Sequence, residues 1–356
     1  MLKYNGRSKR TINFLKTIYF DHPEWIHCDV SLMAATWMKY REELEKLVLA
    51  HPRIFPNYKK GSRSFDAAGG ILAETGRHKD NWGVVFANIE RGLSSIPISY
   101  PIEDWSALDS YIPPDPMTED NFSERGDWEN IRQRFDDAKK NGNLATGGLA
   151  HGFMYMRLYY LRGFENFMLD LASDDPHLPK LIKIVEDYNL KLVEKYLSVG
   201  AEYISAGDDL GLQTSLPMSP EMWRKYIRPS YERIFATCRE SDTPIRLHTD
   251  GHVLPIIPDL IEVGIKLLNP QIRANGLEGL QEMAKGKVAI HQDLDRQLFP
   301  FATPSEIEDH IGEVFEGLYM KEGGLMLHAE CEPDVPLENI EAICRTLEKL
   351  CNPPEI

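Results

Sequence analysis

Two segments of the chain place metal-binding residue types directly after apolar runs. His248 and Asp250 are two positions apart, so in a strand their side chains point to the same face. Cys331 follows a second apolar run, next to Glu330. A histidine, a carboxylate and a thiolate at strand ends can hold zinc and leave the fourth position open. We therefore predict a Zn²⁺ site of His248, Asp250 and Cys331, with Glu330 as a substitute or additional ligand.

Other acidic and imidazole side chains also follow predicted strands. Asp208 and Asp209 end the run at 201–209, where either could donate a proton or orient a substrate. A turn with a capping carboxylate explains the same pair equally well. His291 is a third catalytic candidate at a strand end, weighed against the commoner case of a histidine that only completes the core or its rim.

A group of aromatic side chains follows the predicted strand at 144–150. His151, Phe153 and Tyr155 are candidate substrate-binding residues there, because aromatic walls favour a flat ligand. Helical core packing is the commoner explanation for aromatic residues in such a segment. Both interpretations stay open at the level of sequence.

From residue 144 onward, apolar runs alternate with amphipathic segments. The runs predict strands and begin at Leu144, Ala201, Pro244, Ile265, Lys287 and Gly323. Strand alternating with helix predicts a parallel sheet. Two earlier runs, IHCDVSL from Ile26 and WGVVFAN from Trp82, raise the count to about eight, the number that a (β/α)8 TIM barrel needs. An open doubly wound sheet is the alternative, but no glycine-rich phosphate loop supports it.

The first 140 residues are irregular and rich in Trp, Pro and charge. We expect them to form insertions and connectors within a single domain that spans 1–356. Farther along, Ser219 is expected to cap a helix whose second half Pro229 starts or kinks.

Charge and composition exclude several classes of protein. A net charge of −15 over 356 residues disfavours nonspecific nucleic-acid binding. No run of about 18 apolar residues is present, so no membrane span is expected, and the basic N-terminus lacks the apolar segment of a signal peptide. The five cysteines are odd in number and widely scattered, which is typical of free thiols in a reducing cytoplasm.

The order of these motifs resembles the uroporphyrinogen decarboxylase superfamily over most of the chain. It is most similar to the branch of cobalamin-dependent methyltransferases that act in O-demethylation of methoxylated aromatics. The segments that carry the resemblance include YREELEKLVLAHPRIF, DNWGVVFANIERG, GDDLGLQTSLPMSPEMWRKYIRPSYERIF, HTDGHVLPIIPDLIEVG, HQDLDRQLFPFATPSEI and CEPDVPLENIEAI. The resemblance implies a (β/α)8 barrel.

Two departures separate the chain from other branches that it resembles. The decarboxylases carry arginine after the first strand, whereas this chain reads DVSLMAATWMKY with no arginine before Arg41. The methyltransferases that act on thiols use a His-x-Cys…Cys zinc site, and here Asp250 stands where the first of those cysteines would be. A carboxylate leaves a harder zinc ion than a thiolate does, which suits an ether oxygen.

The resemblance therefore implies an O-demethylase component of the methyltransferase I type. It would move a methyl group from a methoxylated aromatic compound to the Co(I) of a corrinoid protein, with cobalamin supplied in trans because the chain shows no corrinoid-binding motif. The alternatives are a decarboxylase-like lyase, a zinc hydrolase, a corrinoid methyltransferase that uses methanol, methylamine or a thiol, and a barrel that only binds. A homodimer is compatible with all of them.

Overall fold

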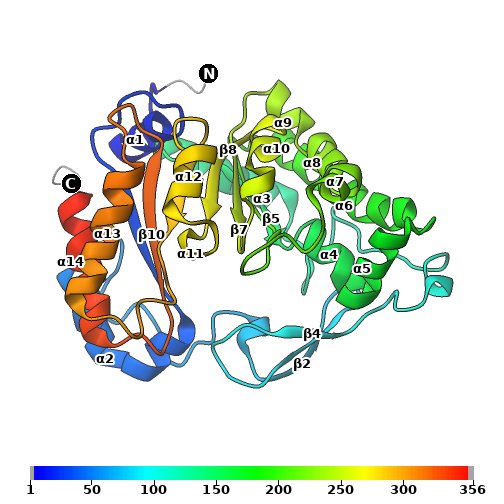
Figure 1. The fold of residues 1–356 in the computed structure, drawn as a ribbon, viewed down its shortest axis with the longest axis horizontal. Coiled ribbons are helices and arrows are strands. Elements are labelled where there is room, and N and C mark those ends of the chain that lie inside the picture. Colours follow the sequence, from blue (N-terminus) through cyan, green and yellow to red (C-terminus); the bar gives the residue numbers. More distant parts are fainter. Residues whose placement is uncertain (1–3, 352–356) are drawn as a thin grey trace. The chain divides into compact units, whose positions relative to one another are not determined.

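Seven of the predicted apolar runs form one parallel β-sheet. The computed structural model describes residues 4–351, and its sheet contains β1 (His27–Leu32), β5 (Thr146–His151), β6 (Tyr203–Gly207), β7 (Ile245–Thr249), β8 (Ile265–Pro270), β9 (Ala289–Asp293) and β10 (Leu325–Cys331). Helices follow the strands along the chain (Figure 1). The predicted α/β class and TIM-barrel type of fold are confirmed.

The helices occupy the amphipathic segments between the strands and much of the N-terminal region. The α-helices are α1 (Lys9–Ile18), α2 (Ala34–Ala50), α3 (Trp128–Lys140), α4 (Tyr155–Arg162), α5 (Phe164–Ser173), α6 (Leu178–Ser198), α7 (Pro220–Tyr226), α8 (Arg228–Ile234), α9 (Ala236–Glu240), α10 (Ile257–Glu262), α11 (Ile272–Asn275), α12 (Leu277–Met283), α13 (Pro304–Leu318) and α14 (Leu337–Leu350). Short 3-10 helices lie at Ile71–Ala73, Trp105–Ala107 and Leu254–Ile256. None of the helices in residues 4–351 combines the length and apolar character needed to cross a membrane.

The expected cap and break of the helix after β6 are both present. The Ser219 hydroxyl accepts a hydrogen bond from the Met222 N–H at 3.2 Å. The helical segment then breaks at Ile227, and Pro229 lies in the first turn of α8. Proline is tolerated there because the first turn of a helix needs no donor from its N–H.

The segment WGVVFAN, predicted as a barrel strand, belongs to a different sheet. It forms β3 (Val85–Asn88), which pairs antiparallel with β4 (Ile96–Ser99) in a three-stranded sheet completed by β2 (Gly76–Lys79). The connection at 89–95 is too short for the crossover of about a dozen residues that a parallel neighbour needs. The prediction of an eighth parallel strand here is therefore wrong.

The described chain divides into two compact units. Unit 1 holds residues up to Ile12, Arg77–Ala87 and Ile96–Leu268, and contributes β7-β6-β5 and most of β8 to the parallel sheet. Unit 2 holds Asn13–Gly76, Asn88–Ser95 and residues from Asn269 onward, and contributes β1-β10-β9. In Figure 1 the blue β1 runs beside the orange β10, although almost the whole chain separates them. The expectation of a single domain over 1–356 stays a prediction.

A buried ion pair fastens the connector at 77–87 to α4 inside unit 1. Arg157 Nη1 lies 2.6 Å from Asp80 Oδ2, and the two side chains are 4% and 0% exposed. The second carboxylate oxygen of Asp80 accepts the Val84 N–H, and the Arg157 guanidinium lies over the Trp82 ring. Because both charges are paired and hydrogen-bonded, their burial is tolerated.

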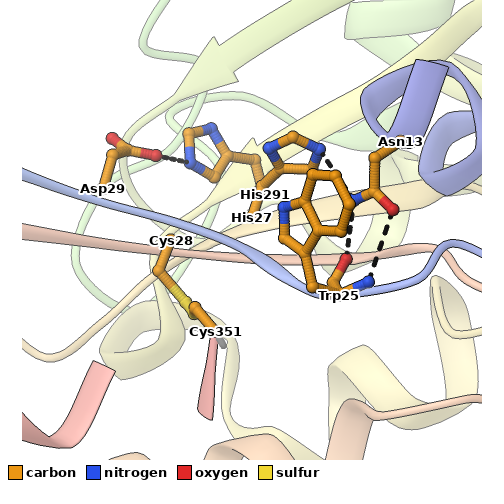
Figure 2. Close-up of a disulfide and its surroundings, with 7 residues drawn as sticks. All are labelled: Asn13, Trp25, His27, Cys28, Asp29, His291 and Cys351. Atoms are coloured by element: carbon orange, nitrogen blue, oxygen red, sulfur yellow. Dashed lines mark hydrogen bonds and ion pairs between the residues drawn. A yellow bond between two sulfur atoms is a disulfide. The ribbon is translucent and has the colours of Figure 1, made fainter. Parts of the chain in front are cut away.

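A disulfide joins the first strand of the sheet to the end of the chain in unit 2. Cys28 of β1 is bonded to Cys351, which directly follows α14 (Figure 2). The expectation of free thiols is confirmed for Cys238, Cys331 and Cys344, all of which are buried, and wrong for Cys28 and Cys351. The pairing was not apparent in the sequence because 323 positions separate the two cysteines.

Reduction of this disulfide should destabilise the protein. We expect the free energy of unfolding to fall by about 2–4 kcal/mol, because the unfolded chain regains the conformations that the cross-link removes. Urea titrations with and without reductant measure the change. In the control, a double Cys28→Ser and Cys351→Ser variant should be insensitive to reductant. Thiol titration of the denatured, non-reduced chain should find three thiols; five would contradict the bond.

A buried histidine links α2 to α14 in unit 2 and makes stability depend on pH. His51 Nε2 lies 2.9 Å from Glu341, and its Nδ1 lies 2.9 Å from Glu348. Burial opposes protonation of His51, but hydrogen bonds to the two carboxylates outweigh it and raise its pKa. The charged form is therefore more favourable in the folded than in the unfolded chain.

This contribution should be complete below about pH 6.5, the pKa of an unperturbed histidine, and should disappear as pH rises through the higher folded pKa. We expect His51→Gln to lower the free energy of unfolding more at about pH 6 than at about pH 9. Urea titrations of both proteins at the two values provide the measurement. His177→Gln, at an exposed histidine beside Asp175, is the matched control. An equal loss of unfolding free energy at both pH values would exclude a stabilising interaction of protonated His51 with the two glutamates.

Candidate metal centre

Two histidines and an aspartate converge at the carboxyl ends of three neighbouring strands in unit 1. His151 ends β5, Asp209 follows β6 and His248 lies in β7. His151 Nε2 is 3.0 Å from Asp209 Oδ2, and His248 Nε2 is 3.9 Å from Asp209 Oδ1. One ligand atom from each residue falls within a group no more than 4.8 Å across. Strand ends are where barrel enzymes of this type carry their chemistry.

Asp250 adjoins this group, as the His-x-Asp spacing predicted. Its Oδ1 lies 3.2 Å from His248 Nε2, and its backbone N–H donates to Asp209 Oδ1 at 3.1 Å. The side chains of Asp209, His248 and Asp250 are a quarter to a third exposed, whereas that of His151 is half exposed. His151 is therefore the most accessible member of the set.

The loops that carry these acids are held by a close approach of two backbones. Gly251 has a φ of +81°, and a Cβ there would lie 2.2 Å from the carbonyl carbon of Gly211. The Gly211 N–H donates to the Asp250 carbonyl, and the His252 N–H donates to the Leu212 carbonyl. Only glycine fits both the space and the backbone angle, so this contact fixes the loop after β6 against the loop after β7.

Asp208 plays a different part from its neighbour. Its side chain is fully buried and accepts hydrogen bonds from the N–H groups of Tyr155 and Met156, at 2.6 and 2.9 Å, and from the Tyr231 hydroxyl at 2.8 Å. Burial raises its pKa to about 6, against the lowering effect of these donors. The carboxylate thus ties the end of β6 to the first turn of α4, where a negative charge is favoured.

The electrostatics of the group depend on His151 and Asp209. Burial opposes protonation of His151, but the hydrogen bond and the charge of Asp209 outweigh it and raise the pKa of His151, with smaller contributions from Asp208 and Asp250. The imidazole is therefore stabilised in its positive form. A cation held between the same carboxylates would replace this proton.

The aromatic candidates lie in the core of unit 1. Phe153 and Tyr155 are 3% and 2% exposed. Phe153 packs against Tyr231 and Phe235, and Tyr155 packs against Tyr159 and Phe167. Their contact with a substrate stays a prediction.

The remaining predicted site residues lie in unit 2. Along β10, burial alternates so that His328 and Glu330 are partly exposed, while Ala329 and Cys331 are buried. Burial raises the pKa of the Cys331 thiol, and Glu330 is paired with Arg296 at 2.5 Å. The roles predicted for Cys331 and Glu330 as zinc ligands stay predictions.

His291 contacts Asp29 within unit 2. Its Nε2 is 2.8 Å from Asp29 Oδ1, and His328 Nδ1 is 2.5 Å from Asp29 Oδ2. Burial disfavours ionisation of Asp29, but the two histidines hold the pKa of this carboxyl well below its usual range. Asp29 and His328 were both visible in the sequence as strand residues, but nothing there indicated that they meet.

In the sequence, His151 is a candidate for substrate binding and Asp209 a candidate for donating a proton or orienting the substrate, and neither is grouped with His248. The available signal was that all three stand at or just after predicted strands, whose carboxyl ends share one edge of a parallel sheet. What the sequence lacked was the strand order, which makes β5, β6 and β7 consecutive neighbours.

Comparisons with known proteins agree with this architecture. Residues 98–350 match the uroporphyrinogen decarboxylase (URO-D) family, and no curated protein matches the sequence. The structure of a methyltransferase from Methanosarcina mazei is similar with a TM-score of 0.58 at 14% identity, covering 95% of this chain and 98% of that one. At that identity the likeness is one of fold.

A B12-independent methionine synthase from Shewanella sp. W3-18-1 is more distant, with a TM-score of 0.42 at 11% identity over 78% of this chain and 73% of that one. The family match, by contrast, extends over most of the sequence and includes six of the seven parallel strands. The chain therefore belongs to the uroporphyrinogen decarboxylase (URO-D) family.

Proposed function

We propose that this URO-D family protein is a metal-dependent methyltransferase that moves a methyl group from a methoxylated aromatic compound to the corrinoid of a separate protein. The observation that carries the proposal is the convergence of His151, Asp209 and His248 at the carboxyl ends of adjacent strands. The fold that holds them is shared with a methyltransferase. Reaction class, metal, substrate and partner all belong to the proposal.

The donor set of unit 1 fits zinc. Two imidazole nitrogens and one carboxylate oxygen are the ligands of many catalytic zinc sites, which keep a further position open. Asp250, at 3.2 Å from His248, is available as a fourth ligand or as the group that orients the imidazole. Cys331 is a further candidate ligand, as the sequence predicts. When bound, zinc would supply a Lewis acid to the ether oxygen as the methyl–oxygen bond breaks.

The side chains around the metal-binding group hold its ligands in place. Asp209 contacts both imidazoles and holds them toward a common point. Asp208 fixes the first turn of α4 beside His151 and is a positioning residue, since its carboxylate is buried and fully engaged. His151 is the most exposed member and is therefore the one that a substrate could reach most readily. Such preorganisation lowers the cost of bringing donor and acceptor together.

The proposed substrate class rests on the aromatic residues that follow β5 and on the charge of the chain. Phe153 and Tyr155 follow His151 closely in the sequence, and the segment after β1 offers no arginine before Arg41 for a polycarboxylate. A flat, modestly charged arene therefore suits this protein better than a porphyrinogen does. The corrinoid, as the methyl acceptor, arrives on a partner protein.

The metal site can be tested by zinc analysis of single variants. We expect His248→Ala and Asp209→Asn each to bind one zinc fewer per chain than the parent protein, because each removes a donor of the cluster. The rate of methyl transfer should fall at least about 100-fold. His177→Ala, which removes an exposed histidine beside a carboxylate, is the control. Unchanged zinc content in His248→Ala would refute the assignment.

Cys331→Ala separates the two possible ligand sets. Loss of the same zinc ion would assign the thiolate to the site, as the sequence predicted. Retention would limit the ligands to unit 1. Circular dichroism must show a folded chain in either case, because Cys331 is buried and its truncation leaves a small cavity.

The substrate class can be tested with a panel of methyl donors and a reduced corrinoid protein. We expect methoxylated aromatics to be demethylated faster than methanol, methylamines or methylthiols, and uroporphyrinogen not to be decarboxylated. Methylation of the corrinoid, followed by its absorption spectrum, is the readout. Omitting the corrinoid protein should abolish turnover. A clear preference for methanol or a methylamine would exclude aryl ether demethylation, and turnover without corrinoid would indicate a hydrolase.

A further inference from the structure

Unit 2 contains a second convergence of histidine and carboxylate groups that the proposed methyl transfer does not use. Asp29 lies in β1, His328 in β10 and His291 in β9, which are neighbours in the order β1-β10-β9. Asp29 and His328 are direct partners in the parallel register, and His291 pairs with Met326, two positions before His328. Residues two apart in a strand share a face, so the three side chains come from one face of the sheet.

The carboxylate bridges both imidazoles. Asp29 Oδ1 is 2.8 Å from His291 Nε2, a contact drawn in Figure 2, and Asp29 Oδ2 is 2.5 Å from His328 Nδ1. The ring centroids of the two histidines are 5.4 Å apart. One ligand atom from each residue lies within 4.8 Å of the others. The imidazoles are largely buried, at 12% and 15%, while Asp29 is 44% exposed and open to solvent.

We infer that Asp29, His291 and His328 bind a second divalent metal ion, of the zinc class, within unit 2. Two imidazole nitrogens and one carboxylate oxygen form a complete three-residue ligand set for such an ion, with one or more positions left for water or a substrate. All three ligands belong to unit 2, and none of them is a ligand in the proposed methyl transfer.

The separations of the donor atoms are compatible with an ion. Zinc bonds of about 2.0–2.2 Å to nitrogen and oxygen place tetrahedral donors about 3.4 Å apart. The Asp29–His291 and Asp29–His328 separations would therefore open by less than about 1 Å as the ion replaces the shared protons. Rotation of the solvent-exposed Asp29 carboxylate can supply this movement without disturbing the strands.

The charge around the group also favours a cation. In the described part of the chain, no lysine or arginine is paired with Asp29, whose side chain contacts His291 and His328. Asp293 and Glu330 both lie close enough to act on His328. Glu330 is also paired with Arg296. Acidic side chains gathered in one place are stabilised by a bound cation.

Zinc binding to the metal-free full-length chain provides the test. The parent protein, titrated with Zn²⁺ by calorimetry and then analysed for metal after gel filtration, should bind two ions per chain. A double His291→Ala and His328→Ala variant should bind one, and adding His248→Ala should remove the other. His177→Ala is the matched control and should bind two. Because the His291 and His328 variant tests only the unit 2 ion, and His248→Ala tests only the unit 1 ion, the two proposals can fail independently.

A conservative variant covers the case in which the double variant does not fold. Asp29→Asn keeps the size of the side chain but removes its charge, and should weaken the unit 2 ion by at least about 10-fold. Cobalt substitution gives a second readout, because the visible spectrum of bound Co²⁺ should lose the component that depends on His291 and His328. Parent-like zinc binding in folded Asp29→Asn, or in the folded double variant, would overturn the inference and leave a hydrogen-bonded triad alone.

Discussion

The buried carboxylate of Asp208 is the interaction on which the unit 1 site most depends. It stands at the end of β6 and accepts the first N–H groups of α4 together with the Tyr231 hydroxyl of α8. One side chain thus satisfies donors from two helices that pack behind the strand ends. A carboxylate without these partners would be too costly to bury. Its fixed position leaves the next residue, Asp209, to turn outward between His151 and His248.

Asp208 and Asp209 are adjacent in the sequence but have different surroundings. Asp208 is fully buried and Asp209 is a quarter exposed, because successive side chains at the end of a strand point to opposite sides. The glycine contact between Gly211 and Gly251 then sets the distance between the loops. The same alternation separates Glu330 from Cys331 in β10. Two polar residues in sequence therefore need not share a site.

Local chemistry was predicted well where it depends on a few consecutive residues. The same-face placement of His248 and Asp250, the Ser219 cap and the break before Pro229 all follow from periodicity and side-chain hydrogen bonding over short spans. The parallel strands after residue 144 were also predicted. WGVVFAN was assigned to the wrong sheet because its β-branched residues suit any strand, and the short connection that follows decides the partner.

By itself, the sequence determined the α/β class, the alternation of strand and helix and the candidate residues at strand ends. Tertiary structure alone decided which strand ends became neighbours. It grouped His151 and Asp209 with His248, joined Asp29 to His291 and His328, and paired Cys28 with Cys351. The physical reason is that the two features depend on interactions over different distances along the chain. Hydrophobic periodicity is set within a turn of helix or a few residues of strand, whereas the order of strands in a sheet is set by packing summed over the whole chain.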